Sequence, residues 1–142
     1  GGATEVEMTE KKHRIEDALE AVRSAQEEGI ISGGGVALLR AANSIEVEVE
    51  NDEQMLGVSI VKEACREPLR QMALNAGESP DLIISSVLSA DEDRGWDFRA
   101  GELTNLMESG IIDPVKVTRT ALQNAASCAG TLITTNFGII QV

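Results

Sequence analysis

Apolar residues recur with a helical period along most of this chain. Between Ile15 and Ala25 they follow intervals of three and four residues, with lysine, arginine and glutamate on the opposite side. This pattern predicts an amphipathic helix that is capped at Thr9 and ends at Gly29, a residue type that favours the left-handed conformation after a helix. Polar and apolar residues alternate over residues 5–8, which predicts a short strand before the helix.

The same period predicts six further helices, separated by glycine, proline or polar residues. They span residues 36–42, 53–65, 69–75, 80–87, 103–109 and 115–129. The acidic stretch 45–53 predicts a solvated connection, although its alternation would also suit an edge strand. A charged turn at 91–100 predicts a loop or a tight hairpin, and the β-branched, apolar tail 131–142 predicts a terminal strand.

Composition supports a mainly α protein with an aliphatic core. The chain has 142 residues, 42% of them hydrophobic but only 2% aromatic, so alanine, leucine, isoleucine and valine must fill the interior. This length suits roughly one domain. No apolar run approaches the length of a membrane span, and the first residues carry no signal-peptide pattern. We therefore expect a cytoplasmic protein that has no membrane partner.

Net charge and cysteine spacing exclude two further classes of site. The formal net charge is −12 at pH 7, and the aromatic residues are limited to Trp96, Phe98 and Phe137. A phosphate backbone would be repelled and would find no stacking platform, so we expect no nucleic-acid partner. Cys65 and Cys128 lack the spacing of metal and disulfide sites, which predicts two buried, reduced thiols and no metal site.

Three features are candidates for nucleotide chemistry. The glycine loop Gly33, Gly34 and Gly35 leads directly into a predicted helix, where unpaired amides and the positive end of the helix dipole favour an anion. Asp17 and Asp113 supply carboxylates that could accept from ribose hydroxyls or orient a water. Each feature also has an ordinary interpretation: a flexible joint, a solvated helix charge, and an N-cap before a proline. Neither a Walker-type phosphate loop nor a dinucleotide fingerprint is present, so both interpretations stay open.

Longer blocks of sequence carry a family resemblance. They are residues 5–19 (EVEMTEKKHRIEDAL), 27–41 (EEGIISGGGVALLRA), 67–78 (EPLRQMALNAGE), 110–122 (GIIDPVKVTRTAL) and 132–135 (LITT). In this order and near this spacing, the blocks resemble the group I chaperonins, in the part of the subunit that follows the substrate-binding apical domain. The resemblance extends over almost the whole chain.

This resemblance implies a fold, a division into domains and a function. Residues 1–27 would form the C-terminal part of an intermediate domain, and residues 28–142 the C-terminal half of an equatorial ATP-binding domain. The fold would be a mainly α, multihelical half-domain with a minor β-hairpin and a terminal strand. Its function would be that of an ATP-dependent chaperonin, a ring of identical subunits that contacts a co-chaperonin and unfolded clients through its other domains.

The resemblance also implies a role for individual residues. Asp17 would be catalytic, orienting the hydrolytic water, and Asp113 would hold the ribose hydroxyls. Glu28 and Arg119 would couple intermediate and equatorial domains between subunits. The residues expected to lie against the nucleotide are Gly33, Gly34, Gly35, Asp97, Phe98 and Arg99, with Gly34 the leading candidate of the glycine turn. At the last three positions the family has an Asn-Ala-Ala run, so an amide is replaced by a carboxylate and small side chains by bulky ones.

Other parts of the family pattern are missing. The phosphate-gripping Gly-Asp-Gly-Thr-Thr-Thr loop, which carries the metal-binding aspartate, does not occur in this sequence. ATP with Mg²⁺ is therefore expected only in a complete subunit, and the chain alone is expected not to hydrolyse ATP. An alternative is a nucleotide-inactive, chaperonin-like interaction or scaffold module. Because half of a split domain would lack its partner, we expect exposed apolar surface at residues 56–65, 111–112 and 137–142.

Overall fold

A computed structural model describes residues 1–140 and shows a mainly α protein, as predicted. Its elements are α1 (Glu5–Glu28), β1 (Ile30–Ser32), α2 (Val36–Ser44), α3 (Asp52–Ala64), α4 (Glu67–Asn75), α5 (Pro80–Ser89), β2 (Arg94–Asp97), β3 (Glu102–Asn105), β4 (Ile112–Pro114) and α6 (Val115–Ile133). No helix in this part of the chain is long and apolar enough to cross a membrane.

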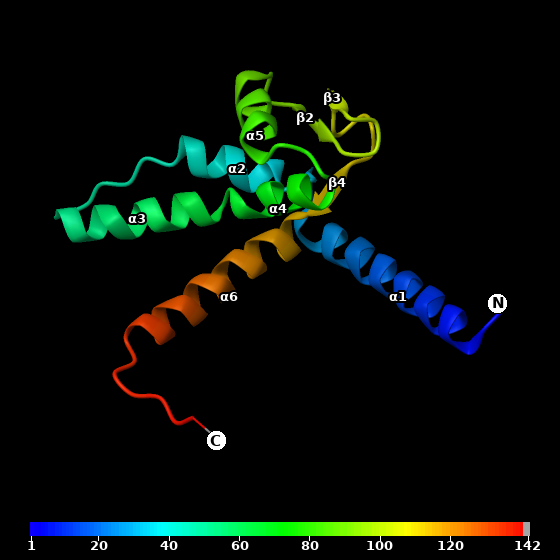
Figure 1. Cartoon of the computed structure of the whole chain (residues 1–142), viewed down its shortest axis with the longest axis horizontal. Coiled ribbons are helices and arrows are strands. Elements are labelled where there is room, and N and C mark those ends of the chain that lie inside the picture. The colour runs from blue at the N-terminus through cyan, green and yellow to red at the C-terminus, as the bar shows by residue number, and fades with distance from the viewer. Residues whose placement is uncertain (141–142) are drawn as a thin grey trace.

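The core is small, and long helices radiate from it (Figure 1). Helices α2, α4 and α5 and the β2–β3 hairpin surround this core, whereas α1, α3 and α6 extend away from it. Helices α1 and α6 meet near the core and then diverge. The buried cluster is aliphatic, as composition predicts: Val36, Leu39, Leu69, Ala73, Ile83, Ile84, Val87 and Leu106.

Two short antiparallel ladders organise the turns. Strand β1 pairs with β4, with Ile31 opposite Asp113, and so joins segments far apart in the sequence. Strand β2 pairs with β3, with Trp96 opposite Leu103, which confirms the hairpin in its predicted place. Gly95 is required there, because a Cβ atom would lie 2.4 Å from Leu106 Cδ1.

The helix predicted for residues 103–109 is wrong. Residues 102–105 form β3, and turns follow as far as Gly110. Gly101 and Gly110 both have positive φ, near 73° and 71°, and these left-handed positions delimit a strand and turn rather than a helix. The apolar residue at position 106 has another reason: the turn after β3 places Leu106 in the core.

The N-terminal expectations also need correction, because residues 5–8 form the first turn of α1 rather than a strand. The helix is capped by Thr4 rather than Thr9: Glu7 N donates to Thr4 Oγ1 at 3.2 Å, and Ala3 N donates to Glu7 Oε2 at 2.7 Å. A reciprocal arrangement of this kind satisfies amides that the first helical turn leaves unpaired. Helical capping therefore overrides the local alternation.

The tail is not the expected strand in its described part. Helix α6 continues to Ile133, and residues 134–140 have no regular structure; residues 141–142 lie outside the described residues. The predicted exposure of apolar side chains is confirmed at Leu56, which is 63% exposed, and at Phe137, which is 92% exposed. Ile112 is exposed, whereas Ile111 is half-buried against the core.

The two cysteines differ. Cys65 is buried as predicted, but Cys128 is exposed, which corrects the expectation of two buried thiols. Helix α6 extends away from the core, so this part of its surface lacks a packing partner within residues 1–140. Burial raises the pKa of the Cys65 thiol and keeps it protonated at neutral pH.

The glycine turn yields the first testable prediction. Gly35 has φ +74°, and a Cβ atom there would lie 2.8 Å from Leu69 N. Gly35→Ala is therefore expected to lower the free energy of unfolding by about 1–3 kcal/mol, measured by chemical denaturation. Gly57→Ala is the matched control, because nothing lies within 4 Å of its Cβ position in α3. It should stabilise by up to about 1 kcal/mol, and equal losses in both variants would contradict the assignment.

Candidate functional site

The glycine turn lies between β1 and α2 and is packed on two sides. Gly33 N donates to Ile111 O at 2.9 Å, and a Cβ atom on Gly33 would come within 3.1 Å of that carbonyl. Gly35 is closed in by Leu69, as described above. Gly34 is different, since its nearest neighbour would be Ile111 Cγ2 at 4.0 Å. The middle glycine is thus the one whose surface stays open.

The amides around this turn are only partly used. Val36 N donates to Gly33 O and Leu39 N to Gly35 O, each at 3.3 Å. Among residues 1–140, the N–H groups of Gly34, Gly35, Ala37 and Leu38 have no hydrogen-bond acceptor. The first turn of α2 carries no acidic residue that would compete for them. Free amides at the positive end of a helix dipole are suited to an anion.

Asp113 is opposite Ile31 in the β1–β4 ladder, two residues before the glycine turn begins. Asp113 is not the N-cap of α6, so the ordinary interpretation of this residue as a helix cap is wrong. Pro114 occupies the cap position, and no side chain caps the helix. The carboxylate is half-buried and forms no ion pair or hydrogen bond with the described residues. Burial raises the pKa of the Asp113 carboxyl. A half-buried carboxylate without a protein partner is available to a ligand that donates hydrogen bonds.

Asp17 shares a face of α1 with residues that approach Asp113. Ala21 and Ala25 line a cleft of about 140 Å³ between α1 and β4, together with Asp113. Asp17 is one helical turn before Ala21 on the same side of the helix, and it is exposed. It lies about 16 Å along the helix axis from Glu28, at eleven residues of 1.5 Å rise. The structure therefore brings together the glycine turn and Asp113, and leaves Asp17 farther out.

Residues 97–99 lie at the tip of the β2–β3 hairpin: Asp97 ends β2, and the turn follows at residues 98–101. Asp97 Oδ1 accepts from Arg99 N at 2.8 Å and from Ala100 N at 3.2 Å. Phe98 is half-buried and packs against the core, whereas Arg99 is exposed. The carboxylate that replaces the family's amide is thus used to hold the turn. Val36, the first residue of α2, contacts this hairpin at Gly95.

Glu28 and Arg119 form a bidentate ion pair between the end of α1 and α6. Arg119 Nε donates to Glu28 Oε2 at 3.0 Å, and Arg119 Nη2 donates to Oε1 at 2.6 Å. Lys116 also donates to Glu27, adding a second link between the same helices. The Arg119 hydrogen bond lowers the pKa of Glu28, and Glu28 raises the pKa of Arg119. The two sequence-predicted residues meet within one chain.

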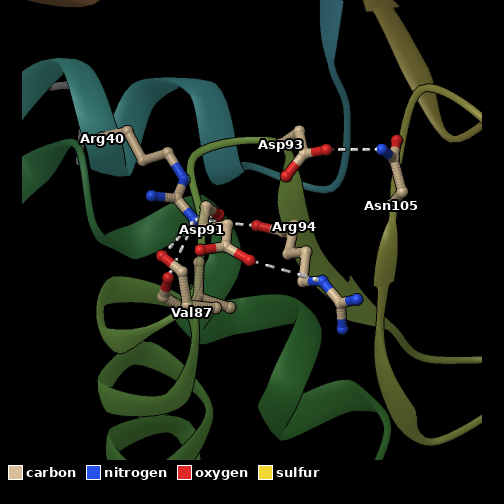
Figure 2. Close-up of polar contacts among 7 residues, drawn as sticks. Arg40, Val87, Asp91, Asp93, Arg94 and Asn105 are labelled. Atoms are coloured by element: carbon tan, nitrogen blue, oxygen red, sulfur yellow. Dashed lines mark hydrogen bonds and ion pairs between the residues drawn. The ribbon is translucent and has the colours of Figure 1, made fainter.

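Arg40 has a prominent position that the sequence analysis did not single out. Its guanidinium reaches from α2 to carbonyl oxygens at the end of α5 and at Arg94 (Figure 2). The only available signal was a single charged residue within the apolar run 36–42. No group of three or more metal-ligating side chains occurs within residues 1–140.

Comparison with known proteins identifies the family. The TCP-1/cpn60 chaperonin family matches residues 1–141, and the chain belongs to this family. A solved structure described as a group III chaperonin in the open state shares the fold with a TM-score of 0.83 and 27% sequence identity. The match covers 98% of this chain and 30% of that chaperonin chain. The chaperonin resemblance is thus confirmed, and the group I subdivision stays a prediction.

The ion pair predicts a pH-dependent difference between variants. The folded pKa of Glu28 is lowered, so its stabilising contribution is present above its ordinary value of 4.5 and is lost as pH falls through the folded pKa. Glu28→Gln is expected to lower Tm at pH 7, and the difference from the parent chain should vanish in acid. Glu10→Gln is the control, because it removes a charge from α1 without removing a contact with α6. A Tm deficit of Glu28→Gln that is unchanged down to pH 3 would contradict this.

Asp113 predicts the opposite dependence. The pKa of Asp113 is raised in the folded protein. Its contribution to stability is therefore greatest below its ordinary value of 3.8, and it is lost as pH rises through the folded pKa. Asp113→Asn is therefore expected to have a higher Tm than the parent chain at pH 7 and an equal Tm near pH 3. Thermal scans at both pH values test this. A lower Tm at pH 7 would show that the fold needs the charge.

Proposed function

We propose that this chain is the C-terminal part of an ATP-dependent chaperonin subunit, with residues 1–27 in an intermediate domain and residues 28–142 in an equatorial domain. One observation supports the proposal: in the β1–β4 ladder Asp113 is opposite Ile31, two residues before the glycine turn, and it is a carboxylate without a partner in the described residues. Membership of the TCP-1/cpn60 family supports it. The folding activity belongs to the complete ring, of which this chain supplies one section.

The proposed site binds a nucleotide through two kinds of group. Asp113 accepts hydrogen bonds from the paired ribose hydroxyls, which are donors that a half-buried carboxylate prefers. The free amides of the glycine turn and of the first turn of α2 face the anionic part of the ligand. Gly33 and Gly35 shape the turn by packing against the protein, and Gly34 leaves room for close approach.

The proposed chemical step is hydrolysis of the terminal phosphate, with Asp17 orienting the attacking water. In the present arrangement Asp17 is exposed on α1 and lies beyond the cleft that Asp113 lines. Catalysis therefore requires α1 to rotate toward the nucleotide, and Gly29, with φ 85°, joins α1 to β1 where this rotation would occur. Closing the site in this way couples nucleotide occupancy to domain movement.

Mg²⁺ accompanies ATP in such a reaction, but the described residues present no cluster suited to it. The proposal assigns no metal ligand to this chain and derives no step through the ion. We propose that the complementary half of the subunit supplies the phosphate loop and the ion. The 142-residue chain alone is proposed to have no ATPase activity.

The proposed partners are further chaperonin subunits, a co-chaperonin and unfolded clients, the last two through other domains. Exposed apolar residues along α3 and the tail, such as Leu56 and Phe137, support burial in a larger assembly. The cytoplasm is the proposed location.

A second candidate is a scaffold module that has kept the packing and lost nucleotide chemistry. The hairpin turn favours it, because Asp97 Oδ1 is occupied by two backbone amides and Phe98 packs against the core. Base recognition through these side chains would require the turn to rearrange. The two candidates differ in whether the complete subunit binds ATP.

ATP titration of the complete subunit, followed by calorimetry, separates the candidates. We expect saturable binding that Asp113→Ala weakens by about 10- to 100-fold, the effect of losing charge-assisted hydrogen bonds. Asp17→Ala should retain binding and lose turnover by about 10-fold or more. Asp52→Ala, an exposed aspartate at the start of α3, is the control and should alter neither. Absence of saturable binding in the parent subunit would support the scaffold.

A further inference from the structure

Arg40 is the fifth residue of α2, the helix that begins directly after the glycine turn. Its Nη2 atom is the donor in every hydrogen bond that the guanidinium makes within residues 1–140. The acceptors are the carbonyl oxygens of Asp91 at 2.6 Å, Arg94 at 2.8 Å, Val87 at 2.9 Å and Ala90 at 3.5 Å. Figure 2 shows the guanidinium lying where α5 ends and β2 begins.

These acceptors explain what the charge does. The last carbonyls of a helix have no intrahelical partner and carry the negative end of its dipole, so a cation there stabilises the helix end. No carboxylate bonds to the Arg40 guanidinium in the described part of the chain; Asp91 directs its side chain to Arg94, at 3.9 Å. The charge is therefore balanced by the end of α5 and by the loop into β2.

Strand β2 is tied to α2 at a second point. Gly95 packs so closely on Val36 that an added Cβ atom would lie 2.8 Å from Val36 Cγ2. Val36 follows the glycine turn directly, and Arg40 lies one turn further along the same helix. The hairpin is thus attached to α2 near the nucleotide end through Val36 and farther along through Arg40.

We propose that Arg40 is a positioning residue that couples the glycine turn to the β2–β3 hairpin, so that nucleotide bound at the turn stabilises the hairpin. This inference rests on the proposed nucleotide-binding function. A nine-residue helix moves as one body, so a ligand that fixes its N-terminus also fixes Arg40. The hairpin carries residues 97–99 at its tip, and its position follows that of the guanidinium.

Two buried donors show where this boundary can change. Arg40 Nε and Trp96 Nε1 are buried without a hydrogen-bond partner in the described residues. Arg40 belongs to α2, and Trp96 belongs to β2 and packs against the core. A buried donor without an acceptor costs free energy. A ligand can therefore shift this contact toward a second conformation.

Hydrogen exchange of the complete subunit, with and without ATP, tests the coupling. In the parent protein, ATP is expected to slow exchange by about fivefold or more in two segments. The first is the glycine turn with the first half of α2, residues 33–40, and the second is the hairpin, residues 94–105. In Arg40→Met, the turn should still respond to ATP and the hairpin should not. Arg40→Lys keeps a cation at the end of α5 and should restore at least half of the lost hairpin response, which a purely structural role would not produce.

Arg94→Met is the matched control. It removes an arginine side chain from the same region and keeps the Arg94 carbonyl that Arg40 needs, so the hairpin response should persist. A hairpin response in Arg40→Met equal to that of the parent would overturn the coupling. If ATP slows exchange at the turn but not at the hairpin of the parent protein, the coupling is overturned and the nucleotide-binding proposal is not. No ATP response at the turn would overturn the nucleotide-binding proposal and the coupling with it.

Discussion

The antiparallel pairing of β1 with β4 determines which distant segments meet. It places Asp113 opposite Ile31, and it continues into the hydrogen bond from Gly33 N to Ile111 O, which fixes the glycine turn. The turn in turn sets the start of α2, and α2 contributes Val36 and Leu39 to the core. The β1–β4 ladder has only three residue pairs, so the close approach at glycine matters: a Cβ atom at Gly33 would lie 3.1 Å from the Ile111 carbonyl and press on it.

The two aspartates proposed for nucleotide chemistry, Asp17 and Asp113, differ in their burial. Asp113 is half-buried without a protein partner, an arrangement that costs stability and is therefore typical of a binding residue. Asp17 is exposed on the surface of α1. Asp97 has gained a local role instead, because its carboxylate closes a turn. The nucleotide proposal consequently depends on Asp113 and the open side of Gly34 far more than on the hairpin tip.

Much of the architecture could be predicted from periodicity, and the misses have physical causes. The helix through residues 53–65 and the break before Pro68 follow from local spacing and proline chemistry, and α3 and α4 confirm both. Residues 103–106 carry leucines at a helical interval, but pairing with β2 decided their conformation, and no local signal reports such pairing. The same holds for the site: the sequence identified Asp113 and the glycines separately, and only the ladder shows that they are neighbours. Arg40 escaped notice because its partners are backbone carbonyls, which no side-chain pattern reveals.

Among residues 1–140, helix α1 is held near its C-terminal end: Ala21 and Ala25 lie against β4, Gly29 O accepts from Val115 N, and Glu27 and Glu28 form ion pairs with α6. Its 24 residues make a rod about 36 Å long, at 1.5 Å per residue. A rotation of about 10° at its base displaces the far end by about 6 Å and Asp17 by about 3 Å. Such a rod acts as a lever arm: a small rotation at its base becomes a much larger displacement at its far end.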